Sequence, residues 1–170
     1  DLEAAGFVDR QQGRGTFVRR DRALRSVTLP MRMAADEIDR SGKTEVRVVE
    51  FDYVLPPVDI ARSLGLDERQ PAQRAVRVRF RDGVPVLHLT TYVPEVIGRT
   101  YDSEEMGRMP LRHLLERAGR GYRKGGQAVG AVLADPSVAS LLRIKIGAPL
   151  VYIRRLLTDA QDRPVEYLEL

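Results

Sequence analysis

Two β-prone runs joined by Asp82-Gly83 give the clearest alternation of hydrophobic and polar positions in the chain. An Asp-Gly pair between such runs predicts a two-residue hairpin, because a type I′ turn needs a positive φ at both central residues. Successive side chains of a strand point to opposite faces, so an uninterrupted hairpin would separate an apolar face from a cationic face. The apolar face would carry Val76, Val78, Phe80, Leu87 and Leu89. The cationic face would carry Arg77, Arg79, Arg81, His88, Thr90 and Tyr92 and would meet something other than the core.

The rest of the pattern predicts strands alternating with helices. Apolar residues recur at helical spacing in residues 31–40, 58–64 and 110–118, and Asp135-Pro136 begins a further helix. Strand-like runs occupy residues 45–55, 127–134, 150–158 and 164–170. Near the start, β-prone residues flank Gly13-Arg14-Gly15 within residues 7–18, which predicts a short hairpin with an arginine at its tip.

Composition narrows the class of protein. The chain has 170 residues, of which 43% are hydrophobic and 31% charged, so it is long enough to bury a real core. No apolar run approaches the roughly 18 residues of a membrane span. The sequence contains no cysteine, which excludes disulfides and thiolate metal sites. Its first residues do not resemble a secretion signal, so we expect a soluble cytoplasmic protein.

Positive charge is concentrated near the start of the chain. The formal net charge is +4, yet residues 10–25 alone contain six arginines and one aspartate. Such a cluster is typical of a segment that meets a polyanion such as DNA. A solvated basic arm is the alternative interpretation, and composition does not decide between the two.

Residues 2–18 carry a longer motif. Leu-x-x-x-Gly-Phe-Val is followed, after one residue, by Arg-x-Gln-Gly-Arg-Gly-Thr-Phe-Val. This stretch resembles the end of the recognition helix and the wing of the winged helix-turn-helix domain in GntR-family transcription regulators. The resemblance implies that Phe17 and Val18 pack inward while the wing lies in the minor groove of operator DNA. The implied DNA-binding residues are Arg10, Gln12, Gly13, Arg14, Gly15 and Thr16.

A second resemblance covers residues 31–170. The motifs that carry it are Arg77-Val78-Arg79 with Asp82-Gly83 and Pro85, Thr91-Tyr92-Val93-Pro94, Ala134-Asp135 with Leu141-Leu142, Gly147-Ala148-Pro149-Leu150 and Arg163-Pro164-Val165-Glu166-Tyr167. In this order they are similar to the UTRA (UbiC transcription regulator-associated) domain of one GntR branch. That domain has an α+β fold, an antiparallel β-sheet flanked by helices, which it shares with chorismate lyase. The chain therefore looks like a fragment with a winged-helix remnant at 1–18, a linker at 19–30 and an effector-binding domain at 31–170.

The resemblance also implies an effector pocket. In this sequence the pocket residues of the family correspond to Arg77, Arg79 and Glu166. Two guanidinium groups on one strand can bind a phosphate or a carboxylate. We also expect Tyr92 and His88 to line this site, because they lie on the predicted cationic face. The alternative interpretation is that His88 is a structural histidine. Arg79 and Glu166 could instead pair with each other. The chain departs from the family's amino-sugar phosphate pattern at Leu89 and Pro110, so the sequence does not name the effector.

The sequence gives little support for an enzymatic function. His88 and His113 are the only histidines, and neither has the partners of a metal or nucleophile site. We therefore expect no enzyme, no metal and no cofactor. The leading hypothesis is a transcription regulator, a repressor in most of this branch, that works as a homodimer on operator DNA and responds to a small anionic effector. A ligand-independent interaction module and a chorismate lyase-like enzyme are the rival hypotheses.

Overall fold

The computed structural model describes residues 8–11, 15–18 and 44–170. Two short strands, β1 (Val8–Gln11) and β2 (Gly15–Val18), pair antiparallel with Val8 opposite Val18. This confirms the hairpin predicted around Gly13-Arg14-Gly15. The tip residues 12–14 and the helix predicted at residues 31–40 lie outside the described residues.

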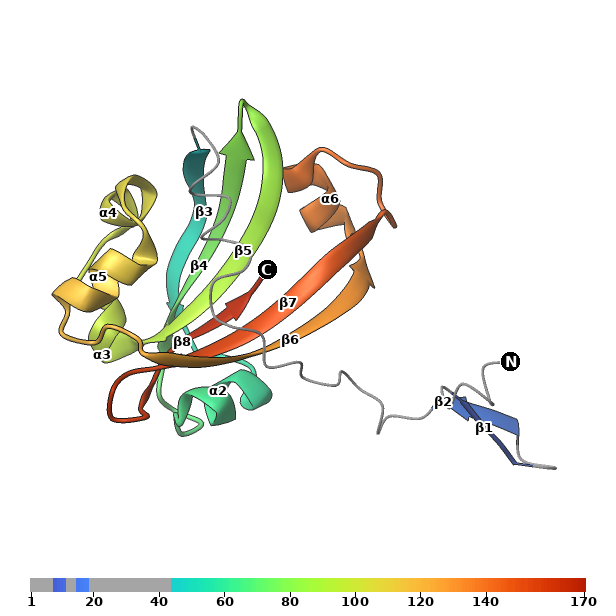
Figure 1. The fold of residues 1–170 in the computed structure, drawn as a ribbon, viewed down its shortest axis with the longest axis horizontal. Coiled ribbons are helices and arrows are strands. Elements are labelled where there is room, and N and C mark those ends of the chain that lie inside the picture. The colour runs from blue at the N-terminus through green and yellow to red at the C-terminus, as the bar shows by residue number, and fades with distance from the viewer. Residues whose placement is uncertain (1–7, 12–14, 19–43) are drawn as a thin grey trace.

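The remaining strands form one antiparallel sheet of six strands in the order β3-β4-β5-β8-β7-β6 (Figure 1). They are β3 (Thr44–Val54), β4 (Ala72–Arg81), β5 (Val84–Pro94), β6 (Lys124–Leu133), β7 (Pro149–Thr158) and β8 (Pro164–Glu169). Every neighbouring pair is antiparallel. Together with the helices this confirms the predicted α+β class.

Five short helices accompany the sheet among the described residues: α2 (Val58–Leu64), α3 (Glu95–Gly98), α4 (Ser103–Arg108), α5 (Leu111–Arg117) and α6 (Pro136–Leu142). The sequence pattern predicted α2, α5 and α6 but not α4. That helix begins at a capping box, in which Asp102 accepts from the Glu105 N–H and Glu105 accepts from the Asp102 N–H. The Asp-x-x-Glu spacing is therefore the signal by which α4 could have been found.

The turn between β4 and β5 has the predicted two residues. Asp82 and Gly83 have φ values of 50° and 77°, and Arg81 lies opposite Val84. Beyond Phe80, which lies opposite Pro85, the register shifts by one residue, so that Arg79 lies opposite Leu87. A β-bulge of this kind inserts one extra residue into one strand. Pro85 has no N–H to donate to the ladder, which suits an interruption at this point.

The bulge overturns the predicted distribution of side chains. Residues opposite each other in an antiparallel pair share a face. Val78 lies opposite His88, Val76 opposite Thr90 and Arg74 opposite Tyr92. The prediction that His88, Thr90 and Tyr92 share a face with Arg77 is therefore wrong, and Leu89, opposite Arg77, lies on the face predicted to be cationic. We name the two sides the arginine face (Gln73, Ala75, Arg77, Arg79) and the histidine face (Arg74, Val76, Val78, His88, Thr90, Tyr92).

Helices cover parts of both faces. Ala75 and Val93 of the arginine face pack with Ile97, Met106 and Leu114, which come from α3, α4 and α5. Figure 1 shows these three helices grouped on one side of the sheet. On the histidine face, Ala72, Tyr92 and Tyr167 pack with Ile60 and Leu64 of α2. The sheet thus has an apolar layer on each side, and polar side chains interrupt both layers.

Candidate functional site

Charged side chains are buried on the arginine face. Arg77 and Arg79 on β4 are each 7% exposed, and Glu166 on β8 is 5% exposed. The register places Ala75 opposite Thr91 and Thr91 opposite Leu168, so Leu168 and Glu166, two residues earlier, lie on the arginine face. The structure therefore brings Arg77, Arg79 and Glu166 onto one face, as the family pattern predicted.

Arg77 and Glu166 are electrostatically coupled. Burial lowers the pKa of Arg77, while the nearby Glu166 and Tyr101 oppose this change. Burial likewise raises the pKa of Glu166, against the attraction of Arg77 and Arg155. The guanidinium groups that act on Glu166 include those of Arg77 and Arg155, and the alternative pairing of Glu166 with Arg79 stays a prediction.

Polar atoms on this face are buried without a hydrogen-bond partner among the described residues. The Tyr101 hydroxyl donates to Gln73 Oε1 at 3.2 Å, and Arg155 Nη2 donates to Gln127 Oε1 at 2.9 Å. Buried atoms left over are Gln73 Nε2, Arg77 Nε, Thr91 Oγ1 and Arg155 Nε. A buried donor without a partner costs about 1–3 kcal/mol, so such a group of donors fits a site that a ligand completes.

Sequence reasoning missed five of these residues: Gln73, Thr91, Tyr101, Gln127 and Arg155. Side chains alternate between the two faces along a strand, so Gln73 lies on the same face of β4 as Arg77. The strand pattern could have indicated this. Arg155 and Gln127 reach the site only because β7 and β6 pair with each other and β8 lies next to β7. Their roles therefore depend on strand order, which the local sequence does not encode.

The remaining predicted residues lie elsewhere. Tyr92 packs in the apolar cluster with Ile60 and Leu64 of α2. His88 lies on the histidine face with Thr90. Of the predicted DNA-binding residues, Arg10, Gly15 and Thr16 belong to the β1–β2 hairpin, with Arg10 opposite Thr16. Gln12, Gly13 and Arg14 lie outside the described residues.

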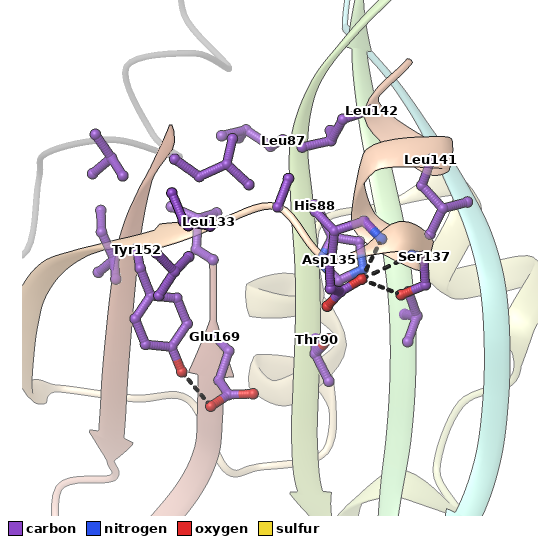
Figure 2. Close-up of a pocket in the computed structure, with 18 of the residues that line it drawn as sticks. Leu87, His88, Thr90, Leu133, Asp135, Ser137, Leu141, Leu142, Tyr152 and Glu169 are labelled. Atoms are coloured by element: carbon purple, nitrogen blue, oxygen red, sulfur yellow. Dashed lines mark hydrogen bonds between the residues drawn. The ribbon is translucent and has the colours of Figure 1, made fainter. Parts of the chain in front are cut away.

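The histidine face contains a cavity of about 680 Å³ (Figure 2). Strands β3, β4, β5, β7 and β8, the end of β6 and helix α6 contribute to its lining. Most lining side chains are apolar, and the polar ones include Glu50, Arg74, His88, Asp135, Tyr152 and Glu169.

Hydrogen bonds fix two carboxylates of this cavity. Asp135 caps α6, since its Oδ1 accepts from the Ser137 and Val138 N–H groups at 2.8 and 2.9 Å and from Ser137 Oγ at 2.9 Å. Figure 2 shows this cluster beside His88. The Tyr152 hydroxyl donates to Glu169 Oε1. Burial lowers the pKa of His88, although the carboxylates around it oppose the effect.

Within residues 8–11, 15–18 and 44–170, no three histidine, aspartate or glutamate side chains gather as a metal site would require. Across the same ranges, no helix has the length and apolar character needed to cross a membrane.

Comparison with known proteins agrees with this geometry. The family model described as the UTRA domain matches residues 39–170. The HTH-type transcriptional regulator Rv0792c of Mycobacterium tuberculosis is 26% identical over 97% of this chain and 62% of its own length. GmuR of Bacillus subtilis, also named an HTH-type transcriptional regulator, is 26% identical over 55% of this chain and 41% of its own length. The chain thus spans about two fifths to three fifths of these relatives.

Solved structures show the same fold. The ligand-binding domain of a protein from Bordetella bronchiseptica assigned to the GntR-family regulators superposes with a TM-score of 0.71 at 27% identity, over 77% of this chain and 84% of that one. PhnF from Mycobacterium smegmatis has a TM-score of 0.70 at 22% identity, over 99% of this chain and 74% of its own, and supports the fold alone. The chain belongs to the UTRA domain family, in the branch that accompanies the GntR-family transcription regulators.

Proposed function

We propose that this chain is the effector-sensing part of a bacterial transcription repressor, and that a small anionic effector binds on the arginine face. The relatives named as transcriptional regulators support the regulatory role. In this proposal Arg77 and Arg79 hold the anionic group of the effector. Glu166 accepts hydrogen bonds from its hydroxyl or amine groups.

The observation that carries the proposal is the excess of buried positive charge around Arg77. Arg77 and Glu166 are buried on the arginine face, and the partly buried Arg155 also acts on Glu166, so two guanidinium groups share one carboxylate. Burying a charge without a matching partner is costly, and a bound anion would offset that cost. A planar guanidinium suits a carboxylate or phosphate because it donates two parallel N–H bonds. Arg77 Nε has no protein partner among the described residues and can supply one of them.

The test is a thermal-shift and calorimetry panel of sugar phosphates, dicarboxylates and neutral sugars. We expect at least one anion to stabilise the protein. Arg77→Met should weaken that anion about tenfold to a hundredfold, since a charge-assisted hydrogen bond contributes about 1.5–3 kcal/mol. Arg74→Met is the matched control, because Arg74 lies on the same strand but on the histidine face, paired with Glu50. Equal losses of anion affinity in the two variants, or no stabilisation by any anion, would refute the arginine face as the effector site.

Signalling requires that the effector favour one arrangement of the regulator over another. We infer a homodimer on operator DNA, in which effector binding changes how two winged-helix domains are presented to two half-sites. In this proposal Arg10, Gln12, Gly13, Arg14, Gly15 and Thr16 contact the DNA through the wing. Arg14→Ala in the intact regulator should weaken operator binding and reduce its salt dependence. Unchanged affinity and an unchanged salt slope would refute the wing assignment while leaving the effector site intact.

A further inference from the structure

We propose that the effector carries an anionic group at each of two ends, and that Arg155 of β7 binds the second group on the arginine face. This inference rests on the proposed function, in which Arg77 and Arg79 of β4 hold the first group. It adds a binding residue three strands away from Arg77 and restricts the effector to molecules with two separated negative charges.

The strand register places Arg155 on the same face as Arg77. Thr91 of β5 lies opposite Ala75 of β4 and opposite Leu168 of β8. Leu168 in turn lies opposite Arg155. Residues opposite each other share a face, and so do residues two apart on one strand. Three strand spacings of about 4.8 Å separate the backbones of β4 and β7 by no more than about 14 Å, which a small ligand and two arginine side chains can bridge.

Arg155 is held in place and keeps a donor for a ligand. Its Nη2 donates to Gln127 Oε1 at 2.9 Å, and Gln127 is 8% exposed. The Nε atoms of Arg155 and Arg77 are both buried and have no hydrogen-bond partner among the described residues. A carboxylate or phosphate accepts two parallel N–H bonds from one guanidinium, and Nε can donate one of them in each arginine. The two arginines therefore offer the same kind of donor from two sides of the site.

The surroundings of Arg155 supply little negative charge. Its opposite neighbours on this face are Leu168 of β8 and Gln127 of β6. Among the described strand residues, the one acid beside it on this face is Glu166, which lies diagonally across the ladder. Arg77 and Arg155 both oppose the rise in the pKa of Glu166 that burial causes, and Arg77 has the larger effect. Arg155 thus shares a single carboxylate with a stronger competitor, and an anionic group of the ligand would offset its partial burial.

Polar atoms lie between the two arginines. Thr91 on β5 and Glu166 on β8 belong to the strands that separate β4 from β7. Thr91 is 0% exposed, and its Oγ1 has no hydrogen-bond partner among the residues described. A hydroxyl group both donates and accepts, so hydroxyl groups of a ligand can satisfy Thr91 and donate to Glu166. Polyols with an anionic group at each end are therefore the probes that match this site.

A matched series of six-carbon ligands tests the second anionic group. Sorbitol, gluconate and glucarate share one polyol chain and carry zero, one and two carboxylates. Sorbitol 6-phosphate and 6-phosphogluconate make the same comparison with a phosphate as the first group. In calorimetric titrations of the whole chain, we expect the second anionic group to tighten binding at least about tenfold in at least one of the two series.

Substitutions on β7 locate the second group. Arg155→Met should remove this gain, so that the ligand with two anionic groups binds no more tightly than its partner with one. Arg155→Lys keeps the charge but loses the planar pair of donors, so it should retain only part of the gain. Arg154→Met is the matched control: Arg154 precedes Arg155 on β7 and lies on the opposite face, across from Glu169, so its loss should leave the gain unchanged.

The outcomes separate this inference from the proposed function. If gluconate or sorbitol 6-phosphate binds and loses affinity in Arg77→Met, but the second anionic group gives no gain, the effector site stands and the role of Arg155 is refuted. Equal losses of the gain in Arg155→Met and Arg154→Met would refute that role as well. If none of the five ligands binds at millimolar concentration, this inference fails, and the wider anion panel decides the proposed function. The titrations of the parent protein give this answer even if a variant does not fold.

Discussion

Arg77 and His88 project from opposite faces of the six-stranded sheet, because Val78 lies opposite His88 while Arg77 lies opposite Leu89. Adjacent residues of β4 therefore face different surroundings. Arg77 belongs to the buried charge cluster and Val76 to the wall of the cavity. A ligand that shifts β4 from the arginine face would therefore also move side chains on the histidine face.

The coupled charges of Arg77 and Glu166 give the first prediction. Arg77→Met should lower the free energy of unfolding by up to about 3–5 kcal/mol, because it removes one of the two guanidinium groups that act on the buried Glu166 carboxylate. The double variant Arg77→Met with Glu166→Leu should recover much of that loss, since two apolar groups need no partner. Urea denaturation at pH 7 measures both. A double variant as unstable as the single one would show that the two charges are not coupled.

Gly98 gives the second prediction, because α3 packs closely against β4. A Cβ at Gly98 would lie 2.4 Å from Gln73 Cβ, which is too close for any relaxed contact. Gly98→Ala should therefore destabilise the protein by about 1–3 kcal/mol. Gly107→Ala on α4 is the control: its Cβ would meet only Val48 Cγ2 at 3.8 Å. That change should stabilise the protein by about 0.5–1 kcal/mol through helix propensity. If Gly98→Ala and Gly107→Ala changed the free energy of unfolding in the same direction, this account would be contradicted.

The turn at Gly83 gives the third prediction. Added Cβ atoms at Gly83 and at Gly126 would meet nothing within 4 Å, but only Gly83 has a left-handed φ, of 77°. Gly83→Ala should cost about 1–2 kcal/mol from backbone strain alone. Gly126→Ala should be neutral or stabilising by up to about 1 kcal/mol, because it restricts the unfolded chain. Thermal denaturation of the two variants side by side measures the difference, and equal midpoints would refute it.

The sequence predicted the elements well because each has a local signal. The Asp-Gly turn, the Asp135-Pro136 helix start and the apolar spacing of α2 and α5 all act within a few residues. The only local signal for the bulge in β5 is Pro85, which does not say how the register shifts, and one extra residue moved His88, Thr90 and Tyr92 to the other face. The burial of Arg77, the coupling of Arg155 to Glu166 and the cavity depend on strand order and on where α6 packs, so they required the structure.

Asp159 gives the last prediction, which concerns pH. It lies in the turn between β7 and β8, and its side chain is 4% exposed. Burial alone would raise the pKa of Asp159, but hydrogen bonds from the Arg163 and Gln161 N–H groups and from the Arg163 guanidinium outweigh it and hold the pKa below its ordinary value. Arg120 Nε also donates to this carboxylate at 3.0 Å.

A lowered folded-state pKa means that the Asp159 carboxylate stabilises the fold above its unfolded pKa of about 3.9, and that this contribution is lost as pH falls through the folded value. Asp159→Asn should therefore lower the urea midpoint at pH 7. The difference in midpoint between the variant and the parent protein should shrink as pH falls below about 4. Asp162→Asn is the control, because Asp162 pairs with exposed Lys124 at 2.8 Å and exposed ion pairs contribute little. If the midpoint difference between Asp159→Asn and the parent protein stays constant between pH 7 and pH 3, the side chain stabilises the turn through its shape and hydrogen bonds, independently of its charge.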